Sequence, residues 1–187
     1  MMRIVAGLVL GAFAAVGARG QSVIPLQKLD LKKFTGTWYE VALLPDKKQK
    51  TCVADAVVLF SEKNKPRQFE LVNSCLMKNG FSNVRNGDGK QDKQEDGKLK
   101  VIYLWPFSVK HWVLAADPDY QWALVGTPNH KNLYVLTKDK TPSDALMAEL
   151  KAKASAQGFD VGKLIMMPQK RPPTMTTGEN SGTSAKP

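Results

Sequence analysis

Short runs of alternating hydrophobic and polar residues fill most of the chain between Gly36 and Lys138, and turn residues separate them. Such alternation over a few residues is typical of strands with one buried face. The runs cover residues 36–44, 52–62, 67–76, 98–105, 110–117, 120–127 and 132–138. Residues 78–97 are polar and rich in glycine, and predict only a weak fourth strand, one that could be broken into two pieces. About eight short strands at this spacing predict an antiparallel barrel or sandwich.

The period changes after residue 140, where the pattern predicts a helix. Thr141 is the expected N-cap, Pro142 the first helical residue, and Gly158 the stop. One apolar face repeats every four residues, at Leu146, Leu150 and Ala154. We therefore expect this helix to pack against the outside of the barrel, and residues 162–167 to form a short final strand.

The strand pattern also indicates which side chains point inward. On the fifth strand Leu99, Val101, Tyr103 and Trp105 share one face. The second strand has Ala54, Ala56, Val58 and Phe60 on one face, and the third has Phe69 and Leu71. In a closed barrel of eight strands these faces point to the interior, which is just wide enough for one small ligand.

Both ends of the chain fall outside this pattern. The first twenty residues, MMRIVAGLVLGAFAAVGARG, combine an early Arg3 with a short apolar run and small residues, which predicts a secretory signal peptide cleaved after Ala18 or Gly20. No cysteine lies near the cleavage region, so we expect no lipid anchor. Residues 168–187 are rich in Pro, Thr, Ser and Gly and predict a disordered tail. The domain should thus span residues 21–167, in the periplasm or outside the cell.

Export changes the interpretation of the two cysteines, Cys52 and Cys75, because disulfides persist in oxidising compartments. The two residues lie at equal distances from the turn between the second and third strands, which places them nearly opposite each other. We expect a disulfide between them. Their spacing does not match a metal site, and nothing in the chain predicts a cofactor.

The formal net charge of +10 favours anionic partners, either nucleic acid or a lipid surface, or simply gives solubility. The basic residues are mostly scattered lysines without an aromatic stacking motif, and an exported protein does not meet nucleic acid, so we expect no nucleic-acid partner. Association with a membrane surface stays open.

Four segments in fixed order resemble the bacterial lipocalins, which are similar to apolipoprotein D. They are GTWYEVALLP, PFSVKHWVLAADPDYQWALVG, LYVLTK and GFDVGKLI, and the resemblance covers residues 29–165. It implies an all-β fold, an eight-stranded up-and-down barrel with one C-terminal helix packed on its side. It also implies binding of small lipophilic molecules such as fatty acids or lysophospholipids.

The resemblance implies that Gly36 and Trp38 close the base of the barrel, with a basic residue stacked over the indole. Lys138 takes the place where the family usually has arginine. A lysine can still make a cation–π contact, although it lacks the planar stacking of a guanidinium. Neither Trp38 nor Lys138 is expected to touch a ligand.

We therefore expect a non-enzymatic protein that binds and carries a lipophilic ligand. His111 shares inward parity with Val113, and we expect it to be a pocket residue rather than a catalytic base. The alternatives are a lipocalin acting as a thiol-dependent enzyme, or as a protein-interaction module. The predicted ligand-binding residues are Ala54, Ala56, Val58, Phe69, Leu71, Leu99, Val101, Tyr103, His111, Val113, Val125, Tyr134 and Leu136.

The loops after the first, third, fifth and seventh strands should surround the open end of such a barrel. They are rich in lysine and carry Asp46 as their acidic residue. This end should favour ligands with an anionic head, unless the lysines are only a solvated fringe. The lysines at this expected portal are Lys47, Lys48, Lys50, Lys78, Lys110 and Lys131.

Overall fold

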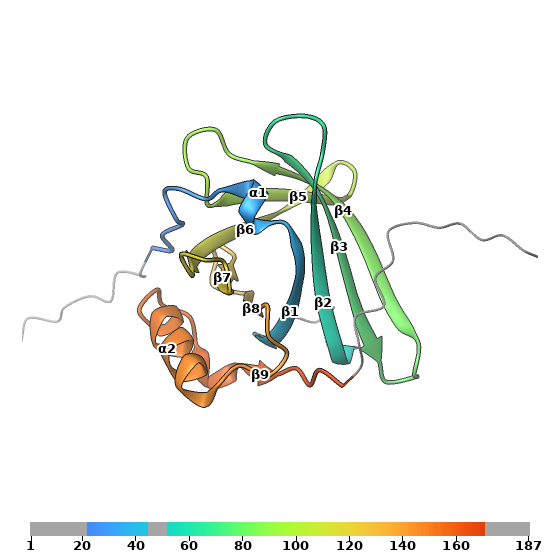
Figure 1. Cartoon of the computed structure of the whole chain (residues 1–187), viewed down its shortest axis with the longest axis vertical. Helices are drawn as coiled ribbons and strands as arrows, with labels where there is room; N and C mark the ends of the chain where they lie inside the picture. Colours follow the sequence, from blue (N-terminus) through green and yellow to red (C-terminus); the bar gives the residue numbers. More distant parts are fainter. Residues whose placement is uncertain (1–21, 45–51, 171–187) are drawn as a thin grey trace, which may run out of the picture.

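Eight antiparallel strands follow one another around a closed barrel in the computed structural model, which describes residues 22–44 and 52–170 (Figure 1). Each strand pairs with the next, and β1 pairs with both β8 and β2, which closes the barrel. The predicted up-and-down barrel is thus confirmed. Its strands are β1 (Gly36–Leu43), β2 (Cys52–Glu62), β3 (Gln68–Met77), β4 (Ser82–Gln91), β5 (Lys98–Leu104), β6 (Phe107–Ala116), β7 (Trp122–Gly126) and β8 (Leu133–Thr137).

The predicted helix is α2 (Asp144–Ser155), and it lies beside the barrel (Figure 1). The expected N-cap at Thr141 is wrong. The Ser143 hydroxyl accepts the Leu146 N–H at 3.2 Å, so the helix starts two residues later than expected and Pro142 precedes it. Gly158, at a φ of +82°, follows the last turn as expected.

The buried face of α2 covers the outside of the barrel. Met147, Leu150 and Ala154 pack with residues of β1, β6, β7 and β8 in a second hydrophobic core. This core is separate from the one inside the barrel, which surrounds Trp38. None of the helices in the described ranges has both the length and the apolar character that crossing a membrane requires.

The prediction of a weak, broken fourth strand is wrong, because β4 is continuous and pairs with β3 from Ser82 to Lys90. Its inward positions include Gly87 and Gly89, which lack the apolar side chains that usually mark the inner face of a barrel strand. Neighbouring side chains fill their space: a Cβ on Gly89 would lie 2.1 Å from a Phe69 ring carbon, and one on Gly87 2.6 Å from a Val101 methyl. The strand therefore needs no large side chains of its own on this face.

The turn between β5 and β6 is shorter than expected. β5 ends at Leu104 after a register shift. Trp105 therefore does not point into the barrel as expected, and it is 82% exposed. β6 already begins at Phe107. Lys110, which was expected in a portal loop, therefore lies within β6 opposite Lys100, and both are exposed.

The disulfide between Cys52 and Cys75 is present, with the two Cα atoms 5.7 Å apart. The predicted register was wrong, because Cys52 is paired with Met77 rather than with Cys75. Two irregularities in β2, on either side of Ala54, shift the strand and bring the cysteines together.

The end of the described chain forms part of the barrel wall. Strand β9 (Ile165–Met166), which follows the short 3-10 helix η2 (Val161–Lys163), pairs with the end of β1, as expected for a short final strand. The Gln169 side-chain amide then donates to the Glu40 and Ala56 carbonyls, each at 3.0 Å, and so bridges β1 and β2. Ordered structure thus extends past the predicted boundary at residue 167. The expected signal peptide at residues 1–20, the portal residues Lys47, Lys48 and Lys50, and the tail from residue 171 lie outside the described residues.

Candidate functional site: the barrel cavity

Trp38 and Lys138 form the closed base, which the short helix α1 (Leu31–Phe34) covers. Trp38 is fully buried, and its indole N–H donates to the Phe34 carbonyl at 2.9 Å. The Lys138 amine lies 3.8 Å from the centre of the indole ring and donates to the Thr37 carbonyl at 3.0 Å. Burial lowers the pKa of Lys138 to about 8, so the amine is still mostly protonated at pH 7.

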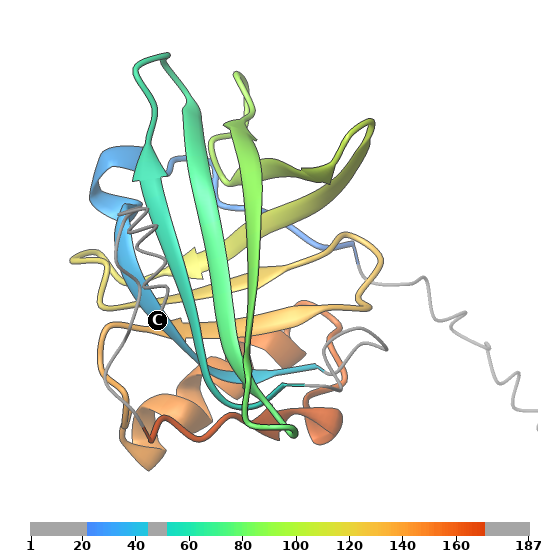
Figure 2. The same ribbon diagram turned by 90° about the vertical axis from the view of Figure 1, so that its right-hand side faces the viewer.

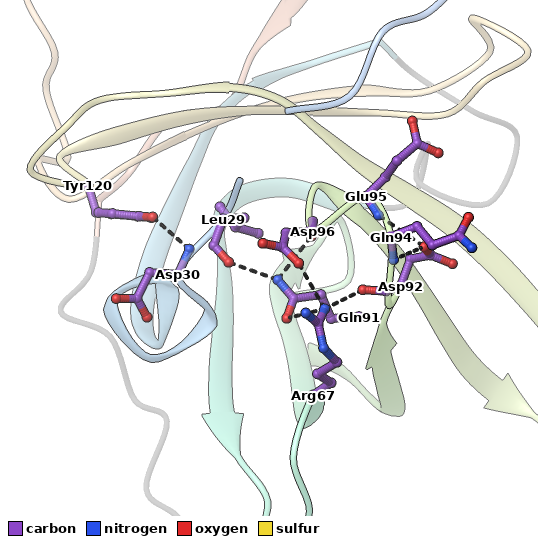
Figure 3. Close-up of polar contacts among 9 residues, drawn as sticks. All are labelled: Leu29, Asp30, Arg67, Gln91, Asp92, Gln94, Glu95, Asp96 and Tyr120. Atoms are coloured by element: carbon purple, nitrogen blue, oxygen red, sulfur yellow. Dashed lines mark hydrogen bonds and ion pairs between the residues drawn. The ribbon is translucent and has the colours of Figure 1, made fainter. Parts of the chain in front are cut away.

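A polar network joins the strands and loops at the base (Figure 3). The buried Gln91 amide donates to the carbonyls of Leu29, at 2.9 Å, and Asp96, at 3.0 Å. The Arg67 guanidinium donates to the Asp96 carboxylate at 2.8 Å and also to the Asp92 carbonyl. These groups bond to one another, so we assign the network to structure rather than to ligand binding.

Away from the base, the barrel encloses a cavity of about 400 Å³. Small-molecule sites commonly measure roughly 300–1,000 Å³, so the space suits one small ligand. The predicted ligand-binding residues that line it are Ala56, Val58, Leu71, Tyr103, His111, Val125, Tyr134 and Leu136.

The other predicted ligand-binding residues do not line the cavity. Phe69, Leu99, Val101 and Val113 belong to the core around Trp38, where they fill the lower part of the barrel. Ala54 is buried between the two irregularities of β2. Parity alone predicts an inward direction, and does not tell a filled layer from an open one.

A polar layer crosses the cavity above that filled core. The Asn73 amide donates to the Tyr103 hydroxyl at 3.0 Å, and His111 Nε2 lies 3.5 Å from the same oxygen. The Arg85 guanidinium carbon lies 4.6 Å from the centre of the Tyr103 ring. Burial, and secondly the charge of Arg85, lower the pKa of His111 to about 4, so its ring is neutral at pH 7.

Arg85, Asn73 and Glu40 also line the cavity, although they are not among the residues predicted from the sequence. The polar, glycine-rich sequence of the fourth strand hides the inward position of Arg85. The signal was its parity: once β4 is taken as one strand, Arg85 shares its inward face with Gly87 and Gly89. On β3, Asn73 follows the parity of Phe69 and Leu71, which is a signal for its inward direction.

The remaining site expectations concern the portal and the thiols. Lys78 and Lys131 are exposed, in the turns after β3 and β7. Cys52 and Cys75 line the cavity as a disulfide, which argues against the alternative of a thiol-dependent enzyme. Within residues 22–44 and 52–170, no cluster of three or more His, Cys, Asp or Glu side chains is arranged to hold a metal ion.

Comparisons with solved structures support the same architecture. Insecticyanin from the tobacco hornworm Manduca sexta superposes with a TM-score of 0.62 at 20% identity, covering 78% of this chain and 83% of that one. Lobster apocrustacyanin A1 also gives 0.62, at 13% identity, covering 83% and 94%. At these identities the likeness shows the fold alone.

Sequence comparisons are more specific. Temperature-induced lipocalin-1 of Arabidopsis thaliana is 31% identical over 155 residues, covering 78% of this chain and 82% of that protein. The outer membrane lipoprotein Blc of Escherichia coli is 30% identical over 177 residues, covering 87% and 90%. Apolipoprotein D of Mus musculus is 33% identical over 106 residues, covering 54% and 53%. The family model for the lipocalin-like domain matches residues 29–169. The chain therefore belongs to the lipocalin family, as a bacterial lipocalin related to apolipoprotein D.

Proposed function

We propose that this lipocalin binds one small lipophilic molecule of the fatty acid or lysophospholipid class in its barrel and carries it outside the cytoplasm. Lipocalins bind small hydrophobic ligands in the barrel, and the observation that carries the finer proposal is the cavity itself. Its floor is the filled core around Trp38, and its walls combine apolar side chains with the polar layer of Asn73, Tyr103, His111 and Arg85. Burying an acyl chain stabilises a complex by about 0.8 kcal/mol per CH₂ group.

The disulfide supports the location, because such bonds persist in the periplasm and in secreted proteins. The E. coli relative is named as an outer membrane lipoprotein, which also fits a place outside the cytoplasm. We propose a periplasmic or secreted protein.

The test is to delipidate the purified protein and titrate it with a fluorescent fatty acid. Ala56, on the cavity wall, is replaced by phenylalanine to fill the cavity; the matched control is Val53→Phe, at an exposed position of the same strand. We expect Ala56→Phe to weaken binding at least about tenfold and Val53→Phe to leave it within about threefold. A wild-type protein that ignores fatty acids and lysophospholipids alike would refute the proposal.

A second candidate function, docking to a membrane surface, is favoured by the tip of the β5–β6 hairpin, which projects from the barrel (Figure 2). Leu104, Trp105 and Phe107 are 72%, 82% and 73% exposed. Exposed apolar groups of this size on a basic protein suit a lipid surface with anionic head groups.

Flotation with vesicles of phosphatidylglycerol or phosphatidylcholine tests this docking. We expect stronger binding to phosphatidylglycerol, and loss of binding in a Trp105→Ser, Phe107→Ser double variant. Ile24→Ser, which removes another exposed apolar side chain, serves as the control. Equal binding by the double variant and the wild type would exclude the hairpin as the docking element.

A further inference from the structure

We propose that Arg85 is the head-group site of the cavity, and that it binds the carboxylate or phosphate of an acidic amphiphile whose chain extends toward the base. Asn73 and Tyr103 lie beside it. This inference rests on the proposed function and adds the chemical class of the ligand's head and its orientation. It differs from the sequence expectation, in which a rim of lysines selects the anion.

The position of Arg85 on β4 supports this assignment. Arg85 is paired with Asn73 across β3 and β4, and both residues line the cavity. Its guanidinium stacks over the Tyr103 ring, 4.6 Å from the ring centre to the guanidinium carbon, which holds the charge at the cavity wall. The hydroxyl and the amide next to it add hydrogen-bonding groups that an anionic head group can use.

Arg85 forms no ion pair with a carboxylate within residues 22–44 and 52–170. The other arginine in these ranges, Arg67, forms an ion pair with Asp96. Glu40 is a carboxylate of β1 that lines the same cavity, and it has its own interaction. Its charge reaches the polar layer, because the pKa of Tyr103 is raised chiefly by burial and also by Glu40. An anionic head group is therefore expected to contact Arg85 directly and to keep away from Glu40.

The layers of the cavity define the direction of the ligand's acyl chain. One step from Arg85 toward the base, Leu71 is paired with Gly87 and lines the cavity; Phe69, paired with Gly89 one step further, belongs to the filled core and forms the floor. Leu71 and the other apolar lining residues above this floor accept methylene groups and exclude a charge. Arg85 itself keeps contact with solvent, so a bound head group need not lose all its water.

His111 does not supply the positive charge at this layer. Its pKa of about 4 leaves the ring neutral at pH 7, and it contributes hydrogen-bonding nitrogens beside the Tyr103 hydroxyl. Arg85 is then the cation of the polar layer among the described cavity residues. A fatty acid and its neutral ester should consequently differ in affinity, and the difference should depend on this one side chain.

The experiment compares the dissociation constants of laurate, lysophosphatidic acid and methyl laurate, each measured by displacement of a neutral fluorophore from the cavity. The variant is Arg85→Gln. The matched control is Lys100→Gln, which removes one positive charge from an exposed position of β5. We expect Arg85→Gln to weaken both acids about tenfold or more, and methyl laurate by less than about threefold. Lys100→Gln should change none of them by more than about threefold.

Arg85→Lys keeps the charge and should retain more acid affinity than Arg85→Gln, which separates charge from folding defects. Titration with inorganic phosphate shows whether the head alone binds: displacement only by acids with a chain supports the amphiphile, and equal displacement by phosphate overturns it. Parallel losses for acid and ester, or an equal loss in Lys100→Gln, overturn the head-group site while leaving the proposed function intact. A wild-type protein that binds neither acid nor ester overturns the proposed function first.

Discussion

His111 should make the stability of this protein depend on pH in a defined window. Its pKa lies at about 4 in the folded protein, against 6.5 for an ordinary histidine, chiefly because burial disfavours the charged ring. Between about pH 4 and pH 6.5 the histidine binds a proton in the unfolded chain but not in the folded protein. The free energy of unfolding is therefore unaffected by the titration of His111 above pH 6.5, and it decreases progressively as the pH falls toward 4.

The size of the effect follows from the two pKa values. Integrating proton binding between them gives about 2 kcal/mol lost by about pH 5 relative to pH 8. Because the His111 residue is only partly buried, at the wall of an open cavity, we expect about 1–2 kcal/mol.

Urea denaturation of delipidated wild-type protein and a His111→Gln variant, at about pH 8 and pH 5, measures this contribution. Carboxylates that titrate in both proteins cancel in the comparison. The wild type should lose about 1–2 kcal/mol more than His111→Gln on acidification. The control variant His130→Gln, which leaves His111 in place, should lose as much free energy of unfolding on acidification as the wild type does. If the variant and the wild type lose the same free energy of unfolding, His111 is not held neutral by its surroundings and the reasoning fails.

Three further changes test the structural elements around the cavity. Lys138→Met should lower the free energy of unfolding by about 1–2 kcal/mol in urea, because the charge over Trp38 and its bonds to backbone carbonyls are lost, and Lys138→Arg should recover part of it. Gly89→Ala should destabilise the protein by about 1–3 kcal/mol, because the new Cβ overlaps the Phe69 ring. A second change, Phe69→Leu, should relieve the clash. If the double variant is no more stable than Gly89→Ala, the overlap is not the cause. Reducing the disulfide should cost about 3 kcal/mol by loop entropy over its 23-residue separation, seen as a lower midpoint in urea; an unchanged midpoint would contradict this.

The barrel was predictable because its strands alternate clearly. In β3 the apolar Phe69 and Leu71 alternate with Gln68 and Glu70, in β5 Leu99 and Val101 alternate with Lys98 and Lys100, and turn residues separate the strands. The apolar face of α2 and the stop at Gly158 were equally clear. The N-cap was misassigned because Thr141 and Ser143 are both good capping residues, and only the backbone shows that Ser143 reaches the Leu146 N–H.

The cavity was less predictable than the barrel. Alternation indicates which residues point inward, but whether a layer is filled depends on side-chain volumes that meet across several strands. Phe69 fills its layer, whereas Ala56 leaves space. The position of Cys52 depended on bulges, which have no clear signal in this sequence.

The two glycines of β4 connect these observations. Because Gly89 has no side chain, the Phe69 ring can lie against β4 and contribute to the filled core beneath the cavity. Because Gly87 has none, the Tyr103 ring also reaches β4, where Arg85 lies over its face. The same residues that make the fourth strand hard to recognise thus bring a tyrosine and an arginine together one layer above an apolar floor. A cation at that height can bind an acidic head while the acyl chain of the same molecule is buried against the apolar lining above that floor, so the affinity for an acid and for its ester should separate at Arg85.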